Sequence, residues 1–354
     1  MNTARPDSVR TNRWRIAVLV VLVLAAAGVG ATLSQNGSDT PASRPNPRIK
    51  MSATRVPTSV ARSTVTAAAM SSRGDVALGT KNGRVRVFPP GATRFGGGIE
   101  LFGDSSSVEL LAFSADGSSV AASTDGGSVR VWRVKSREAV ALRMPGGAFL
   151  SSLALSSDAH LLAAADFNIS VYDLRRERRI ATFEQPVSDG GASPYAELRF
   201  DTSASDVLAS ADGLDKWNLA TGRGTHCPCG SGAISHNARY HSSGTAGGHV
   251  VVTDTRSRRQ LADITADISG RAGPAQISDD GQRLVAGISD GVVAVWRSPR
   301  QITPPTRKRF AREPIVGLQL TAAGDRMLVE TQLPDEAFDK NPPGARNRWL
   351  VSLK

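Results

Sequence analysis

The sequence predicts an all-β protein made of seven copies of one small sheet, arranged as a seven-bladed β-propeller, with a single transmembrane helix before it. Two observations predict the sheets. An Asp-Gly type of turn between short apolar runs returns about every 43 residues, and a strand of alternating polar and apolar residues ends most copies. A period of about 40 to 45 residues with about four strands is typical of a propeller, because one such sheet cannot bury both its faces alone. An uncharged run near the N-terminus predicts the helix.

The clearest copy covers residues 110–132. An apolar run ends at Phe113, a Ser-Ala-Asp-Gly turn ends at Gly117, and a second turn precedes an alternating strand that ends at Trp132. The copy therefore reads as a meander of three antiparallel strands. The first turn of each copy is centred near Gly74, Gly117, Ala159, Ser205, Ala238, Gly281 and Gly324.

These residues resemble the WD-repeat family. Ser114-Ala115-Asp116-Gly117 and Ser278-Asp279-Asp280-Gly281 are similar to its turn, and residues 290–296 are similar to its closing strand. The resemblance covers roughly residues 60 to 354 and implies a degenerate, bacterial, membrane-anchored member. The Trp-Asp ending is degraded to Trp132-Arg133 and Trp217-Asn218, and no Gly-His dipeptide opens a copy. The hydrogen-bond network that the family builds from Asp, His, Ser and Trp is therefore incomplete here.

The N-terminus predicts a membrane anchor. Residues 1–15 form a polar tail with four arginines, and residues 16–33 carry no charge. A helix of that length reaches about 27 Å, enough to cross a hydrocarbon core once. The arginines predict a cytoplasmic tail, and hence an extracytoplasmic propeller at the cell membrane. The alternative is a cleaved secretory signal, because Val29 and Ala31 put small residues beside a possible cut.

The domain boundaries follow from composition. Residues 34–57 are rich in Pro, Ser and Asn and predict a disordered linker, which leaves residues 58–354 for the propeller. The last copy ends in a third strand near Trp349 with no fourth strand after it. We expect the segment from Val60 to Thr66 to supply that outer strand and close the ring.

Both cysteines lie in the irregular fourth copy. Cys227 and Cys229 follow His226, and His236, His241 and His249 come soon after. Soft ligands gathered in this way suggest a metal site of His226, Cys227 and Cys229. The alternatives are a local disulfide between Cys227 and Cys229, two inert thiols, or redox catalysis.

The formal net charge of +11 is concentrated in two stretches. We expect a basic interaction patch that attracts anionic wall polymers, lipid headgroups or an acidic protein; the alternative is a solvated basic face. Nucleic acid is not expected, since no recognition motif accompanies the charge and the chain is predicted to be exported. The patch consists of Arg175, Arg176, Arg178, Arg179, Arg307, Lys308 and Arg309.

The sequence contains no catalytic or phosphate-binding motif and implies no cofactor. We therefore expect a membrane-tethered, non-catalytic binding scaffold for a protein or cell-envelope partner. The alternative is an extracytoplasmic enzyme or metal-binding propeller. Its site would lie at the mouth of the central channel and involve His226 and Cys227.

Overall fold

The structure, a computed structural model, describes residues 49–354 except 61, 93, 145–149, 167, 185–194, 246, 267–271, 289–290, 300–303 and 334–345. The predicted tail and transmembrane helix lie outside the described residues. Among the residues that are described, no helix has the length and apolar character needed to cross a membrane.

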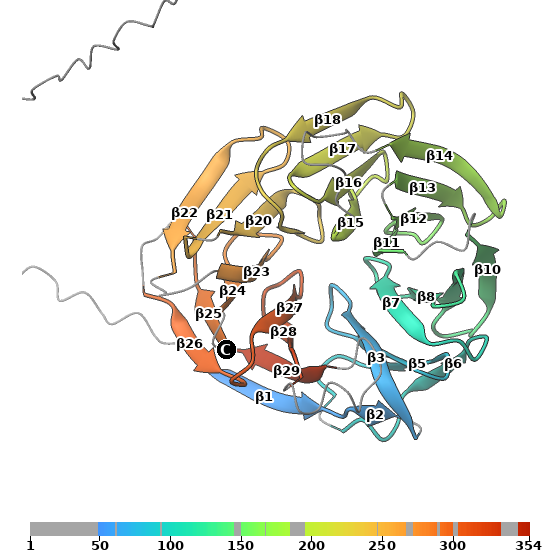
Figure 1. The fold of residues 1–354 in the computed structure, drawn as a ribbon, viewed down its shortest axis with the longest axis horizontal. Helices are drawn as coiled ribbons and strands as arrows, with labels where there is room; N and C mark the ends of the chain where they lie inside the picture. Colours follow the sequence, from blue (N-terminus) through green and yellow to red (C-terminus); the bar gives the residue numbers. More distant parts are fainter. Residues whose placement is uncertain are drawn as a thin grey trace, which may run out of the picture. The chain divides into compact units, whose positions relative to one another are not determined.

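Seven antiparallel sheets surround a central axis (Figure 1), which confirms the predicted propeller. Blades 1 to 6 follow the chain in order. The first strand of each four-stranded meander is innermost, and in blade 1 a short additional strand precedes that meander. Blade 1 consists of β2 (Ser59–Val60), β3 (Ser63–Met70), β4 (Val76–Thr80), β5 (Arg84–Phe88) and β6 (Ile99–Phe102). Blade 2 consists of β7 (Val108–Phe113), β8 (Ser119–Thr124), β9 (Ser128–Arg133) and β10 (Ala139–Arg143). Blade 3 consists of β11 (Ser152–Leu155), β12 (Leu161–Ala165), β13 (Asn168–Asp173) and β14 (Arg178–Glu184).

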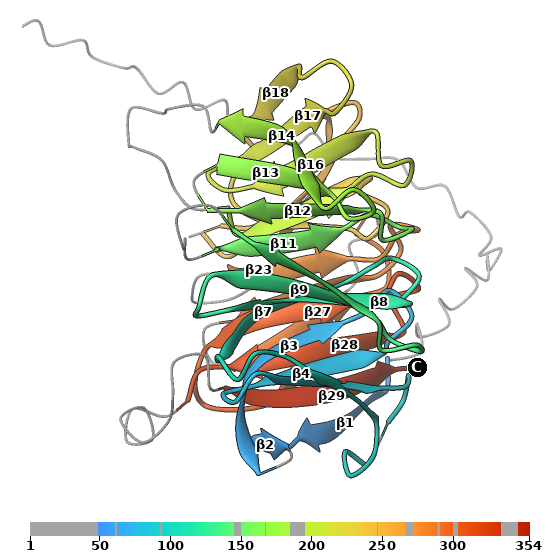
Figure 2. The same ribbon diagram turned by 90° about the vertical axis from the view of Figure 1, so that its right-hand side faces the viewer.

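The remaining blades repeat the arrangement, and the side view in Figure 2 shows the strands running across the thickness of the ring. Blade 4 consists of β15 (Glu197–Phe200), β16 (Asp206–Ser210), β17 (Leu214–Asn218) and β18 (Gly224–Cys227). Blade 5 consists of β19 (Ala233–Ile234), β20 (Tyr240–Gly244), β21 (His249–Asp254) and β22 (Gln260–Thr265). Blade 6 consists of β23 (Ala272–Ile277), β24 (Leu284–Ile288), β25 (Val292–Trp296) and β26 (Thr306–Arg309). Blade 7 consists of β27 (Ile315–Leu320), β28 (Arg326–Thr331), β29 (Asn347–Leu353) and β1 (Met51–Val56).

The ring is closed by β1, which corrects the sequence-based expectation. β1 pairs with β29 along its whole length, from Met51 opposite Leu353 to Val56 opposite Arg348. Val60, which was expected to close the ring, instead lies in β2 and pairs with β3 of blade 1. Residues 51–56 therefore belong to the propeller and not to a linker. An outer strand is held mainly by its backbone, and Val56 is the one buried side chain of β1, so no apolar pattern marks it.

The turn between the first and second strands of each blade is the same in all seven blades. Its fourth residue has positive φ and donates its N–H to the carbonyl of the first, as Gly117 does to Ser114 at 2.9 Å. Six of the seven predicted turn centres are confirmed. The exception is blade 4, where Ala204 takes the left-handed conformation and not Ser205.

The core is divided among the interfaces between blades. Each hydrophobic cluster joins two neighbouring sheets, for example Val76 of β4 with Leu328 of β28 and Leu350 of β29. The cluster between blades 4 and 5 is the smallest, and it includes Leu208 and Ile234. Since no sheet buries both faces by itself, closing the ring completes the core.

Candidate interaction surface

The strand order gives the propeller two different faces. Strands alternate in direction, so the turn after the first strand and the turn after the third strand of each blade emerge on the same side. We call this side the turn face. The opposite side, the loop face, carries the turns after the second strands and the connections between blades.

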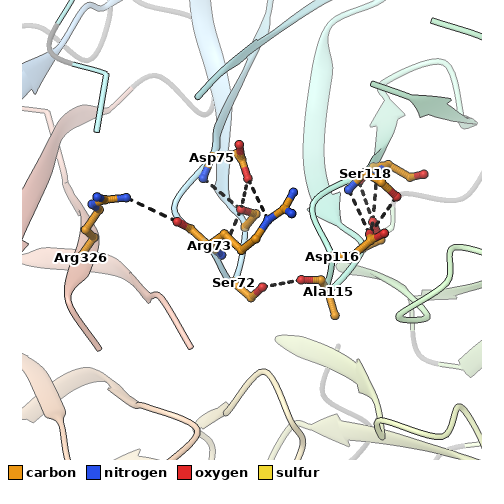
Figure 3. Close-up of polar contacts among 10 residues, drawn as sticks. Ser72, Arg73, Asp75, Ala115, Asp116, Ser118 and Arg326 are labelled. Atoms are coloured by element: carbon orange, nitrogen blue, oxygen red, sulfur yellow. Dashed lines mark hydrogen bonds and ion pairs between the residues drawn. The ribbon is translucent and has the colours of Figure 1, made fainter. Parts of the chain in front are cut away.

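The first-to-second-strand turns of neighbouring blades touch one another (Figure 3). The Ser72 hydroxyl of blade 1 donates to the Ala115 carbonyl of blade 2. The Ala322 N–H of blade 7 donates to the Ser72 carbonyl at 2.9 Å. The Arg326 guanidinium reaches the Arg73 carbonyl at 3.5 Å. These contacts hold the turns of blades 7, 1 and 2 against one another on the turn face.

Two carboxylates in these central turns, those of Asp116 and Asp158, are held in their ionised form. Burial opposes ionisation of Asp116, but hydrogen bonds from the Ser114 hydroxyl and from the N–H and hydroxyl of Ser118 outweigh it. The pKa of Asp116 therefore lies below its usual value. The pKa of Asp158 in blade 3 is lowered in the same way, with the Ser156 hydroxyl as a hydrogen-bond donor. These carboxylates thus accept hydrogen bonds within their own turns.

The turns that follow the third strands carry a dense set of cations. These turns in blades 2, 3, 4 and 5 are consecutive around the ring and expose eleven Lys and Arg side chains. The same four turns also contain four acidic residues, Glu138, Asp173, Glu177 and Asp254, so their net formal charge is eleven minus four, or +7. We call these eleven cations the basic rim: Arg133, Lys135, Arg137, Arg175, Arg176, Arg178, Arg179, Arg223, Arg256, Arg258 and Arg259.

Local backbone chemistry holds the rim turns in one shape. Arg137 and Arg258 have positive φ, and each donates its N–H to the carbonyl four residues earlier at 2.8 Å. In blade 5, the Asp254 side chain accepts the N–H groups of Arg256 and Ser257. This carboxylate folds back onto the turn, and the arginine side chains project into solvent.

Asp173 does the same in blade 3. It accepts the N–H groups of Arg175 and Arg176 and forms an ion pair with the Arg176 guanidinium at 2.7 Å. The hydrogen bond from the Arg176 side chain is the largest cause that lowers the pKa of Asp173. The acid at the base of this turn is therefore already paired, and Arg178 and Arg179 remain exposed.

The loop face differs in charge. The cations on its described turns and connections are Arg62, Lys81, Arg312 and Arg346, and they are accompanied by acids such as Asp104, Asp125, Asp166 and Asp212. The positive charge of the described propeller is therefore concentrated on the turn face.

The predicted basic patch is split by the fold. Arg175, Arg176, Arg178 and Arg179 lie at the β13–β14 turn, but the second group lies in β26, across the ring from β14 (Figure 1). Arg307 donates to the Ala266 carbonyl at 2.7 Å, and Lys308 donates to the Met51 carbonyl at 3.0 Å. These two cations hold blade 6 to its neighbours. The rim cations of blades 2, 4 and 5 were missed, although several cations follow the third strand of blade 2 and of blade 5 in the sequence.

The predicted His-Cys cluster does not gather at the channel mouth. His226 lies in β18, the outermost strand of blade 4, where its Nδ1 is 2.8 Å from Asp215 Oδ1. The buried Tyr195 hydroxyl donates to the other oxygen of Asp215 at 3.2 Å, and burial followed by this carboxylate raises the pKa of Tyr195. His226 is thus oriented by Asp215 on the outside of the ring, so the expected site of His226 and Cys227 at the channel mouth is wrong.

Cys227 and Cys229 are free thiols that pack against the small cluster between blades 4 and 5. Burial, followed by the neighbouring Cys227 thiol, raises the pKa of Cys229 to about 12. Within the described chain no group of three or more His, Cys, Asp or Glu side chains is arranged to hold a metal ion. The metal and disulfide hypotheses stay predictions for analysis of the purified protein.

The other three histidines of the predicted cluster are dispersed. His236 contacts the Leu320 carbonyl at 2.8 Å, and burial lowers its pKa to about 3. His241 is fully buried beside Ser210, and burial lowers its pKa to about 4. His249 lies on β21 and pairs with Asp263. Alternation of side chains along β-strands sends neighbouring residues to opposite faces, which is why closeness in sequence does not produce a cluster.

The central channel contains a cavity of about 430 Å³ lined by first strands of several blades. Glu197 and Arg199, both on β15, form an ion pair there at 3.1 Å, and burial raises the pKa of Glu197. Arg348 reaches from β29 to the Val65 and Thr66 carbonyls of blade 1, and pairs with Glu330 at 2.5 Å. Arg348 therefore joins blade 7 to blade 1, whereas Glu197 and Arg199 pair within blade 4.

The fold defines the chain as a seven-bladed β-propeller. Residues 99–133 match the model of the family described as WD domain, G-beta repeat. With this match and its seven repeated sheets, the protein is similar to WD-repeat propellers. A search of curated proteins found no match.

Proposed function

We propose that the protein is a membrane-tethered, non-catalytic scaffold whose turn face holds an anionic partner, either an acidic protein or a component of the cell envelope. WD-repeat propellers commonly serve as scaffolds for protein interactions, and this coarser role agrees with the fold. The tether in this proposal is the uncharged run of residues 16–33, and the propeller is extracytoplasmic because arginines precede that run.

The basic rim carries the proposal. Its cations lie on turns of four consecutive blades, so they act together on one partner and not as isolated surface charges. The turns hold their backbone through their own hydrogen bonds, and this preorganisation lowers the entropy lost when a partner binds. A field of one sign also speeds the encounter with an oppositely charged partner.

The test is recovery of partners from detergent-solubilised membranes with three forms of the full chain. The first is wild type, the second is Arg137→Gln/Arg178→Gln/Arg258→Gln on the rim, and the third is Arg62→Gln/Lys81→Gln/Arg312→Gln on the loop face. Both variants lose three charges. We expect a partner recovered by wild type and the loop-face variant and lost with the rim variant. Equal recovery by all three would reject the turn face as the binding surface.

A further inference from the structure

Building on the proposed function, we propose that the anionic partner of the basic rim is the phospholipid surface of the membrane itself. The propeller then rests with its turn face toward the bilayer and its loop face outward. This assigns one face to lipid and leaves the other for further partners.

The point where the N-terminal segment enters the propeller supports this orientation. The Lys50 N–H donates to the Lys354 carbonyl at 2.8 Å, and the Lys354 N–H donates back to Lys50 at 3.0 Å. Leu353 in turn donates its N–H to the carbonyl of Asp325, which lies between β27 and β28. That turn is on the turn face. The chain therefore enters the propeller on the same side as the basic rim.

Chain length keeps this side near the membrane. Residues 34–48 separate the predicted span from Ile49, and 15 residues reach at most about 50 Å even when fully extended. The loop face is farther by the length of a strand, about 17 Å for the five residues of β17. The tether sets this upper limit on the separation, and attraction to anionic lipid acts once the turn face comes within about 10 Å of the bilayer.

The form of the rim fits a broad surface better than a single acidic peptide. Its cations follow an arc across blades 2 to 5, and each blade presents them on a turn of the same type. A planar bilayer contacts the whole arc at once, and guanidinium groups form paired hydrogen bonds with phosphate oxygens. Each cation near an anionic surface strengthens binding by roughly fivefold.

The test measures which face lies on the lipid. The full chain with Cys227→Ser and Cys229→Ser receives one fluorophore, at Thr221→Cys on the turn face or at Asp212→Cys on the loop face; both positions are exposed and belong to blade 4. The chain is floated with phosphatidylcholine vesicles, with or without phosphatidylglycerol, that contain a lipid with a nitroxide on its headgroup. This quencher acts only over short distances.

We expect strong quenching at residue 221 and weak quenching at residue 212 in anionic vesicles. The difference should disappear in neutral vesicles and at high salt. The rim variant Arg137→Gln/Arg178→Gln/Arg258→Gln should lower the vesicle-contacting fraction at least tenfold, and the loop-face variant should not. Glutamate already occupies the matching left-handed position at Glu177, so this turn does not require arginine to fold.

Quenching at residue 212 equal to or above that at residue 221, quenching independent of anionic lipid, or failure to float with either kind of vesicle would overturn the proposal. The two proposals fail separately. Rim-dependent capture of a protein without quenching at residue 221 would make the partner a protein and keep the scaffold. Quenching at residue 221 with no captured partner would keep the lipid contact and remove the scaffold.

Discussion

Replacing Arg348 with methionine should strongly destabilise the propeller. The Arg348 side chain is 3% exposed, and its guanidinium pairs with Glu330 at 2.5 Å within blade 7. It also donates to the Val65 carbonyl at 3.4 Å and to the Thr66 carbonyl at 3.3 Å in blade 1. The same side chain thus satisfies a carboxylate and joins the last blade to the first.

The cost follows from what the substitution leaves behind. Methionine fills much of the space, but the Glu330 carboxylate, itself only 15% exposed, loses the guanidinium beside it. Removing one partner of a buried ion pair costs about 3–5 kcal/mol, because an uncompensated charge stays buried. Removing both partners, as in Arg348→Met/Glu330→Gln, should cost less than the sum of the single changes, with a coupling of about 2 kcal/mol.

The assay is urea unfolding of the full chain followed by tryptophan fluorescence. Arg312→Met is the control, because Arg312 is exposed on the loop face and should change the free energy of unfolding by less than about 0.5 kcal/mol. A cost below about 1 kcal/mol for Arg348→Met, or strictly additive single and double variants, would refute the structural role given to this pair.

Three further predictions concern stability and reactivity. Deleting residues 51–56 removes the strand that pairs with β29 and should lower the melting temperature in differential scanning fluorimetry, whereas an unchanged melting temperature would reject closure by β1. His241 has a pKa of about 4 in the folded protein, so below about pH 6.5 the unfolded chain binds more protons at this residue than the folded chain does. This group should therefore lower the free energy of unfolding by about 2 kcal/mol between pH 8 and pH 5. A His241→Gln variant should lose that part of the pH dependence. The Cys229 thiol, with a pKa of about 12, should react with iodoacetamide at pH 8 far more slowly than the thiols of the urea-unfolded chain, and equal rates would contradict its burial.

The repeat was predictable because the turns must be made of particular residues. Every first turn begins with an oxygen-bearing side chain and has a left-handed residue three positions later. Gly74, Gly117, Gly281 and Gly324 therefore mark their blades even where the sequences of the surrounding strands differ from the repeat. β1 was not predictable by the same means. Its residues are mostly exposed and its pairing partner lies at the other end of the chain, so neither pattern nor proximity reveals it.

Only part of the interaction surface could likewise be predicted from the sequence. A run such as Arg175 to Arg179 is visible as a local cluster, but Arg137, Arg223 and Arg258 join it only because the ring brings equivalent turns to one face. The predicted site at Cys227 was wrong for the opposite reason: closeness in sequence did not bring the side chains together. Its residues are adjacent in sequence, yet His226 turns to Asp215 and the thiols pack between blades.

The most direct measurement of the central claim is the affinity of the full chain for soluble polyphosphate at increasing salt concentration. Polyphosphate carries the anionic charge but has neither the fold of a protein nor the surface of a bilayer. If the basic rim binds anions, binding should be salt-sensitive, weakened at least tenfold by Arg137→Gln/Arg178→Gln/Arg258→Gln and left unchanged by Arg62→Gln/Lys81→Gln/Arg312→Gln. Binding that ignores salt, or that falls equally in both variants, would contradict this claim.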